Sequence, residues 1–291
     1  FNEMIDAHIE ANADISIATL PVNAKDAPEF GILKTNSENC IESFIEKPAA
    51  ALLPEWESEV SDQMKSEGKL YLASMGIYIF NKKLLIELMK NPDTKDFGKE
   101  IIPQAVGNKK ILSYQYEGYW TDIGNIDSFF EANIGLTDDV PKFNLFDNYN
   151  KIYTRPRLLP PSKFHNTKVD KSFISEGCII NAKEISKSVI GIRSRIGEGT
   201  VIQNSYVMGN DFYQNIEDMI EDTANNRQLI GIGKNCFISN AIVDKNCKIG
   251  NDVYIQGGKH LENTTHDLYA IKEGIVVIKK GVTIPNNFTI K

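Results

Sequence analysis

The sequence predicts a two-domain protein, in which an α/β domain precedes a parallel β-helix made of hexapeptide repeats. An apolar residue recurs every six positions in the second half of the chain. Neither a helix nor a single strand produces that period, but a coil of short parallel strands requires it. Strand-like and helical segments alternate in the first half, as they do in a sheet layered with helices. At 291 residues, the chain is long enough for about two domains.

The hexapeptide repeat starts after about residue 169 and continues to the end of the sequence. Residues 209–229 interrupt it with acidic and amide residues, and we expect them to form a loop extruded from one corner of the coil. Glycine and asparagine fit the other corners, because tight turns need residues that tolerate a positive φ. The repeated apolar positions, which we expect to point inward, are Ile190, Ile196, Ile202, Met208, Val243, Ile249, Ile255, Ile278, Ile284 and Ile290.

The first domain is expected to alternate strands with helices. Residues 137–168 have the proline content of a linker, so we place the α/β domain at 1–140, the linker at 141–168 and the β-helix at 169–291. Periodicity and turn residues predict a helix over 1–13, a buried strand over 15–22, a hairpin of strands 30–35 and 40–46, a weakly helical segment 49–69, a strand over 71–81, a helix over 82–90, a loop leading into a helix over 95–106, a strand over 111–118 and a helix over 125–137.

The composition is that of a folded globular protein and excludes several classes of function. Hydrophobic residues make up 42% and charged residues 24% of the chain, which is ordinary for a soluble domain. The formal net charge is −7 and no run of Lys and Arg exceeds three residues, so neither nucleic acid nor a membrane is an expected partner. The chain begins at Phe1 with no signal-peptide pattern, and we expect it to continue a longer protein.

Cysteine and histidine patterns argue against zinc binding and nucleophilic catalysis. The four cysteines lack C-x-x-C spacing and do not cluster with histidine, so we interpret them as reduced, buried thiols of a cytoplasmic protein. The four histidines show no triad spacing with serine or cysteine, and we interpret them as surface or packing residues. These residues are Cys40, Cys178, Cys236, Cys247, His8, His165, His260 and His266.

Three short segments of the first domain could carry chemistry. In FIEKP, Glu46 and Lys47 end a strand before Pro48, so a sugar-binding carboxylate and a phosphate-binding ammonium stand side by side. Taken alone, the tripeptide is explained more simply as a solvated strand end. Ser74 lies two positions before Gly76 on a bulky strand, which suits either a ligand approaching the backbone or close packing against a helix.

The third segment is YWTDIGN, where Asp122 lies between a strand and a helix. A carboxylate in such a loop can hold Mg²⁺ together with substrate phosphates. It can equally act as a helix N-cap, for which aspartate is among the best residues.

Taken together, ten motifs give the chain a specific resemblance to ADP-glucose pyrophosphorylase (glucose-1-phosphate adenylyltransferase). The resemblance runs over essentially the whole chain, and the C-terminal part is most similar to the plant and cyanobacterial branch. It implies a partial Rossmann-like nucleotidyltransferase domain followed by a left-handed parallel β-helix. The motifs are FGILKT, FIEKP, ASMGIYIF, KDFGKEIIP, YWTDIGN, PRLLPPSK, YVMGNDFY, GIGKN, AIVDKNCKIG and AIKEGIVVI.

The resemblance also implies a reaction and its participants. AMP would be transferred from ATP to α-D-glucose 1-phosphate with release of pyrophosphate, for glycogen or starch synthesis. Mg²⁺ would neutralise the developing charge. The implied assembly is a homotetramer in the cytoplasm, regulated by anionic metabolites.

Site residues follow from the same resemblance, position by position. Glu46 corresponds to the ligand of the glucose hydroxyls, Lys47 to the ligand of the sugar phosphate, and Ser74 to a further sugar contact. Gly31 corresponds to a close backbone approach to the substrate, and Asp122 to a metal-binding catalytic aspartate. The implied effector site comprises Arg155, Arg157, Lys245 and Lys272, where Arg155 departs from the glutamine common in the plant branch.

One part of the family pattern has no equivalent in these 291 residues. The glycine-rich nucleotide loop and the first catalytic aspartate would precede the helix with which the chain begins. We therefore expect these residues to be inactive on their own. Three alternatives stay open: a non-catalytic regulatory subunit, a hexapeptide-repeat acyltransferase, and a nucleotidyltransferase that uses GTP, UTP or dTTP.

Overall fold

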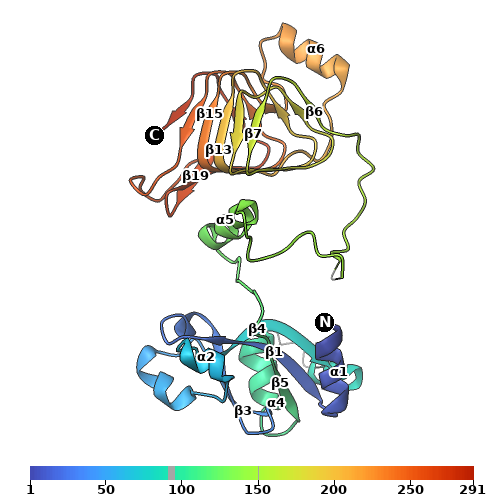
Figure 1. The fold of residues 1–291 in the computed structure, drawn as a ribbon, viewed down its shortest axis with the longest axis vertical. Helices are drawn as coiled ribbons and strands as arrows, with labels where there is room; N and C mark the ends of the chain where they lie inside the picture. Colours follow the sequence, from blue (N-terminus) through green and yellow to red (C-terminus); the bar gives the residue numbers. More distant parts are fainter. Residues whose placement is uncertain (91–95, 150) are drawn as a thin grey trace. The chain divides into compact units, whose positions relative to one another are not determined.

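Figure 1 shows the fold in a computed structural model, which describes residues 1–90, 96–149 and 151–291. The predicted loop over 95–106 starts at Lys95, which lies outside the described residues. The chain divides into two units, Phe1–Trp120 and Thr121–Lys291. Within the described ranges, no helix has both the length and the apolar character needed to cross a membrane.

The first unit is built on a five-stranded mixed sheet with strand order β3-β2-β4-β1-β5. Strands β1 and β5 are parallel, whereas β4 is antiparallel to both β1 and β2, and β2 and β3 form the predicted hairpin. Strand β1 is the centre of the core, because seven of its eight residues are buried. The strands are β1 Ile15–Val22, β2 Gly31–Thr35, β3 Ile41–Glu46, β4 Tyr71–Phe80 and β5 Ile111–Gln115.

Short helices complete this unit and confirm the predicted mixed α/β class. Buried Ile102 and Leu84, from two of the helices, pack with Ile15, Leu33 and Ile111 of the sheet in one apolar cluster. Burial of such side chains is the main source of folding free energy. The helices are α1 Asn2–Glu10, α2 Asp62–Ser66, α3 Lys82–Leu88 and α4 Ile102–Ala105, with the helical turns η1 Ala27–Glu29, η2 Ala50–Trp56 and η3 Phe97–Ile101.

The second unit is a coil of short parallel strands, as the six-residue period predicts. Successive coils align in register, so each face of the coil contributes one inward column. One column contains Ile180, Ile196, Ile232, Ile249 and Ile284; the next Ile185, Ile202, Ile238, Ile255 and Ile290; the third Ile190, Val207, Val243 and Ile278. Every predicted inward position is buried except Met208. Met208 is half-buried and packs against a cluster outside the coil interior.

The parallel strands of the second unit begin before residue 169, where the β-helix was predicted to start. Strand β6 lies in the predicted linker, and it pairs in parallel with β9 of the coil. The strands are β6 Lys163–Phe164, β7 Lys168–Asp170, β8 Phe173–Ile174, β9 Ile179–Ile180, β10 Glu184–Ser186, β11 Val189–Ile190, β12 Arg195–Ile196, β13 Val201–Val207, β14 Gly231–Ile232, β15 Phe237–Val243, β16 Lys248–Ile249, β17 Tyr254–Gln256, β18 Thr264–Thr265, β19 Tyr269–Lys272, β20 Ile275–Ile278, β21 Thr283–Ile284 and β22 Thr289–Ile290.

Two excursions leave the coil. The expected extruded loop at 209–229 contains a helix, α6 Ile216–Ala224, which Figure 1 shows projecting from the side of the stacked coils. Asn215 caps it by accepting a hydrogen bond from the Asp218 amide at 2.7 Å, and acidic residues in the first turn suit the helix dipole. The second excursion is the hairpin of β18 and β19.

Helix α5 (Ile126–Ile134), continued by η4 (Gly135–Thr137), belongs to the second unit rather than the first. Its buried Phe130 and Ile134 pack with Ile242 and Ile275 of the coil. The sequence division at 140 placed this helix in the α/β domain. Helical spacing identifies the apolar face of a helix but not the surface that covers it.

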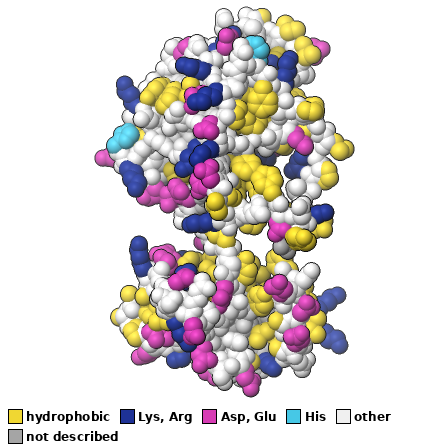
Figure 2. Space-filling view, viewed as in Figure 1, with side chains coloured by type: hydrophobic (Ala, Val, Ile, Leu, Met, Phe, Trp, Pro, Cys, Tyr) yellow, Lys and Arg dark blue, Asp and Glu magenta, His cyan; other side chains and the backbone are white. Residues whose placement is uncertain are grey.

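The four cysteines differ in how deeply they are buried. Cys178, Cys236 and Cys247 are buried in the β-helix, whereas Cys40 in the first unit is only half-buried, unlike the expectation for all four. Figure 2 shows basic and acidic side chains intermingled on the face in view. This mixing agrees with the absence of a long basic run in the sequence.

Candidate substrate site

The hairpin of β2 and β3 places the Glu46 carboxylate over a glycine. Gly31 and Glu46 are directly opposite in the antiparallel register. A Cβ on residue 31 would lie 2.7 Å from Phe44 Cζ and 2.8 Å from Glu46 Oε2. Because real Cβ contacts are not that short, a side chain at position 31 would force the Phe44 ring or the Glu46 carboxylate to shift. The two predicted residues, Gly31 and Glu46, therefore lie together at one edge of the sheet.

A second carboxylate, Asp96, lies beside the first. The Cβ position of Gly98 is 3.5 Å from Asp96 Oδ1 and 3.7 Å from Glu46 Oε2, so both carboxylates approach the same glycine. Asp96 Oδ1 also accepts a hydrogen bond from the Lys99 amide at 2.8 Å and caps the π-helical turn η3. Together, the two side chains provide several acceptor oxygens suited to sugar hydroxyls.

A β-bulge orients Ser74 on strand β4. Its partner strand β1 shifts register between Ile17 and Thr19, and Gly76 adopts a φ of +70° in the bulge. The Gly76 amide donates a hydrogen bond to Ser74 Oγ at 3.3 Å. Bulges redirect side chains at the edge of a site, and the left-handed φ explains why residue 76 is glycine.

Tyr78 connects Ser74 to the carboxylates. Burial raises the pKa of the Tyr78 phenol, a hydrogen bond with Ser74 lowers it, and the charges of Glu46 and Asp96 raise it. The phenol therefore stays protonated as a hydrogen-bond donor at neutral pH. Its ring stacks on Phe97 with the centroids 5.7 Å apart.

Lys47 has an unusual backbone conformation. Its φ is +47°, in the left-handed region, and its amide donates to the Phe30 carbonyl at 3.0 Å. A residue other than glycine in this region costs about 1–3 kcal/mol, and such residues cluster at functional sites. The side chain is exposed, and none of the described residues forms an ion pair with it. Its ammonium is available to an anion.

Asp122 belongs to the first residues of the second unit, whereas the other predicted substrate residues belong to the first. It is exposed, and its Oδ1 accepts a hydrogen bond from the Gly124 amide at 3.0 Å. The helix cap of α5 is Asn125, whose side chain accepts from the Ser128 amide at 2.8 Å. Asp122 therefore does not serve as the N-cap of that helix.

The predicted effector residues lie at separate places in the second unit. Arg155 and Arg157 are exposed in a segment without regular structure, where Arg157 Nη1 donates to the Arg155 carbonyl at 3.1 Å. Lys245 forms an ion pair of 2.7 Å with Asp211. Lys272 pairs with Ile275 at one end of β20, whereas Lys245 follows β15 beyond the other end. The strand registers therefore do not bring the two lysines together.

A cavity of about 390 Å³ lies elsewhere in the first unit and contains none of the predicted site residues. Its lining includes Asn23, Asp26 and Lys69 together with Tyr119 and Trp120. The residues that sequence reasoning missed are Asp96, Gly98 and Tyr78. Two of the quoted motifs contain them, but only the fold brings those motifs to one place.

Two matches to known families divide the chain in the same order as the fold. Residues 1–139 match the family described as nucleotidyl transferase. Residues 157–289 match the GLGC left-handed parallel beta-helix domain. The first match covers the sheet with Gly31, Glu46 and Ser74, and the second covers the coil. The N-terminal part of the chain is therefore similar to nucleotidyl transferases, and the C-terminal part is similar to the GLGC left-handed parallel β-helix domain.

Proposed function

We propose that this chain is part of a glucose-1-phosphate adenylyltransferase and binds the sugar phosphate. The observation that carries the proposal is the arrangement of Glu46 against Gly31 and Gly98, with Lys47 next to it in a left-handed conformation. Glu46, Asp96 and the Tyr78 phenol offer acceptors and a donor for sugar hydroxyls. An adjacent free ammonium suits the phosphate of the same substrate.

In the proposed reaction, a phosphate oxygen of α-D-glucose 1-phosphate attacks the α-phosphorus of ATP. The bond between that phosphorus and the bridging oxygen breaks, and pyrophosphate leaves with the electron pair. Lys47 holds the attacking phosphate and offsets its charge, while Glu46 fixes the sugar ring. The contribution of these residues is positioning and electrostatic stabilisation.

Mg²⁺ is the cofactor that this chemistry requires, and Asp122 fits it as one carboxylate ligand. One of its oxygens accepts from the Gly124 amide, which fixes the side chain, and the carboxylate is exposed. Mg²⁺ is commonly held by one or two carboxylates together with substrate phosphates. When bound, the ion would neutralise charge on the phosphates.

The finer assignments belong to the same proposal. These are ATP as the nucleotide, a role in glycogen or starch synthesis, a tetrameric assembly and an anion-responsive site at Arg155, Arg157, Lys245 and Lys272. We further propose that the 291 residues alone do not catalyse turnover. The sequence offers no glycine-rich loop to hold the triphosphate.

Calorimetric titration of the chain with glucose 1-phosphate tests the proposal. We expect binding that weakens at least about tenfold in Lys47→Gln, because a hydrogen bond to a charged group contributes about 1.5–3 kcal/mol. Lys83→Gln, an exposed lysine in α3, is the matched control and should bind as the parent does. Equal affinity in parent and Lys47→Gln would remove Lys47 from the site. Pyrophosphate release by this chain with ATP and Mg²⁺ would overturn the proposed inactivity.

A further inference from the structure

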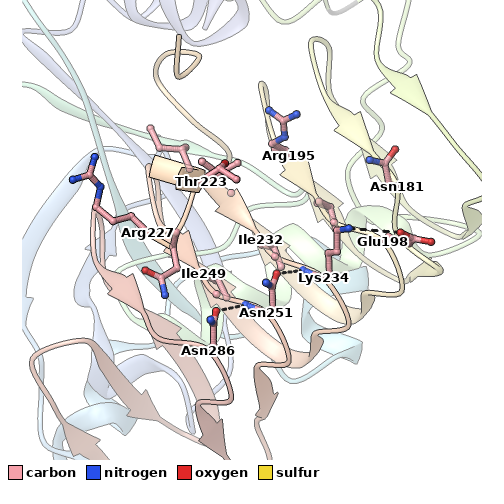
Figure 3. A pocket seen from close by; sticks show the side chains of 18 of the residues that line it. Asn181, Arg195, Glu198, Thr223, Arg227, Ile232, Lys234, Ile249, Asn251 and Asn286 are labelled. Carbon is pink, nitrogen blue, oxygen red and sulfur yellow. Dashed lines mark hydrogen bonds and ion pairs between the residues drawn. The ribbon is translucent and has the colours of Figure 1, made fainter. Parts of the chain in front are cut away.

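A cavity of about 600 Å³ lies between the α6 excursion and one face of the coil. Its walls come from the end of α6 and the segment that follows it, and from the corners of successive coils at residues 195–198, 231–234 and 249–251. Figure 3 shows Thr223 and Arg227 on one side of this space and Arg195, Lys234, Asn251 and Asn286 along the coils. The size is that of a small-molecule site. We call it the α6 groove.

The wall formed by α6 is fixed by its own polar contacts. Asp222 accepts hydrogen bonds from Arg227 Nε at 2.7 Å, from Gln214 Nε2 at 2.6 Å and from Lys248 Nζ at 3.3 Å. Gln214 also accepts from the Ile230 amide at 3.0 Å. The Asp222 carboxylate is therefore neutralised by Arg227 and by Lys248 of the coil, and Arg227 also pairs with Glu221 at 2.7 Å.

Arg195 is left without an acidic partner. Among the described contacts, its guanidinium reaches only Met219 Sδ, at 3.2 Å, and a thioether is a weak acceptor. Lys234 lies 3.9 Å from Glu198, but both side chains are mostly exposed, at 64% and 79%, so this pair is weak. The charged residues that line the groove are Arg195, Arg227, Lys234 and Glu198, and of these Arg227 is already paired with Glu221 and Asp222.

Two asparagines on successive coils add donors. Asn251 Oδ1 accepts from the Lys234 amide at 2.8 Å, and Asn286 Oδ1 accepts from the Asn251 amide at 2.8 Å. Because a backbone amide can only donate, each side-chain oxygen must face the backbone. Each NH₂ group is thereby held away from the backbone, and both asparagines line the groove. Figure 3 shows this ladder running from Asn286 through Asn251 to Lys234.

We propose that the α6 groove binds a free phosphorylated metabolite of sugar-phosphate size. Charge-assisted hydrogen bonds from Arg195 and the two asparagine amides would hold the phosphate, and Glu198 at the rim would accept from hydroxyls. The cations differ from the predicted effector residues, since Arg155, Arg157, Lys245 and Lys272 do not line this groove. The proposal does not depend on the proposed catalytic function.

Titration with ribose 5-phosphate and with inorganic phosphate tests the groove, with ribose as the uncharged control. Isoleucine-methyl NMR spectra of the chain locate the ligand, because the half-buried Ile230 lines the groove outside the coil core and its methyl groups report on it. We expect ribose 5-phosphate to shift these methyls and ribose to leave them unchanged. Shifts confined to isoleucines of the first unit, or no binding at millimolar concentration, would overturn the proposal.

Two variants separate ligand binding from folding. Arg195→Gln removes the unpaired charge, and Asn251→Asp keeps the acceptor for the Lys234 amide while replacing the NH₂ donor with a negative oxygen. Each should weaken ribose 5-phosphate binding at least tenfold with the remaining methyl spectrum unchanged. Lys187→Gln, an exposed lysine of the coil away from the groove, should bind as the parent does. Parent-like affinity in both groove variants would place the ligand elsewhere.

Discussion

At the scale of single residues, the candidate substrate site depends on two backbone features. Gly31 leaves space for the Glu46 carboxylate, and Lys47 holds a left-handed φ of +47°. Both residues lie at the same end of the hairpin formed by β2 and β3. A change of backbone conformation at either residue would therefore move the side chains that would hold the sugar phosphate. The requirement at position 31 is steric, whereas Lys47 carries backbone strain.

The variant Gly31→Ala tests the steric requirement. The new Cβ would collide with Phe44 and Glu46, so we expect the Glu46 carboxylate to be displaced. The affinity for glucose 1-phosphate should then fall at least about tenfold, and the thermal stability should also decrease. Calorimetry and thermal unfolding measure the two effects. Gly135→Ala is the control, because the nearest atom that its Cβ would meet, Asp138 Oδ2, would be 3.9 Å away. Unchanged affinity in Gly31→Ala would argue against a role for this contact.

Thiol reactivity at neutral pH tests the burial of the cysteines. Burial raises the pKa of Cys178, of Cys236 and of Cys247, the last to about 11. Because the thiolate is the reactive form, we expect these three to react slowly with a disulfide reagent, and half-buried Cys40 to react first. Cys40→Ser should remove the fast phase. A fast phase that persists in this variant would contradict the prediction.

At the scale of elements, helices α5 and α6 are each held in place by contacts that the periodicity of a helix does not predict. Helix α5 packs through Phe130 and Ile134 on the coil. Helix α6 is held by the Asp222 contacts to Arg227, Gln214 and Lys248. The first attachment is apolar and insensitive to pH, whereas the second depends on one carboxylate charge.

Acid should therefore loosen α6 selectively. The Arg227 hydrogen bond, with those of Gln214 and Lys248, holds the pKa of Asp222 below its ordinary value, and burial opposes them. A lowered folded pKa means that the stabilisation is complete above about pH 4 and is lost as the pH falls further, toward the folded pKa. Hydrogen exchange of α6 should accelerate below pH 4 relative to the coil.

The variant Asp222→Asn should show fast α6 exchange already at neutral pH, because the charge is absent. Glu217→Gln, in the first turn of the same helix, is the control and should exchange much as the parent does. Equal protection of α6 in Asp222→Asn and the parent would show that another contact holds the helix.

At the scale of the whole molecule, the two units have separate cores. The first centres on buried β1, and the second on the three inward columns of the coil. Both tryptophans, Trp56 and Trp120, belong to the first unit. Fluorescence therefore reports unfolding of the first unit alone, whereas circular dichroism reports both.

This separation makes core variants informative. Ile238→Ala removes a fully buried side chain from a coil column and should lower the free energy of unfolding of the second unit by about 2–5 kcal/mol. The circular dichroism transition should shift while the fluorescence midpoint stays constant in urea. Leu33→Ala, fully buried in the first unit, should shift the fluorescence midpoint together with the part of the circular dichroism change that comes from the first unit, and leave the part from the coil unchanged. A matching fluorescence shift in Ile238→Ala would mean that the two units unfold together.

The sequence by itself determined the coil, the alternating α/β unit and the motifs that carry Gly31, Glu46, Lys47, Ser74 and Asp122. A repeat of six needs only local periodicity, because each coil pairs with the next. The motifs are likewise contiguous in the chain.

Only the tertiary structure decided which of these residues meet. It placed Asp96 beside Glu46 and Tyr78 near both, moved α5 onto the coil, and folded the interruption at 209–229 into a helix that walls a groove. These outcomes depend on contacts between residues far apart in sequence. Local pattern cannot specify them, because a given apolar face or polar group can be satisfied by several partners.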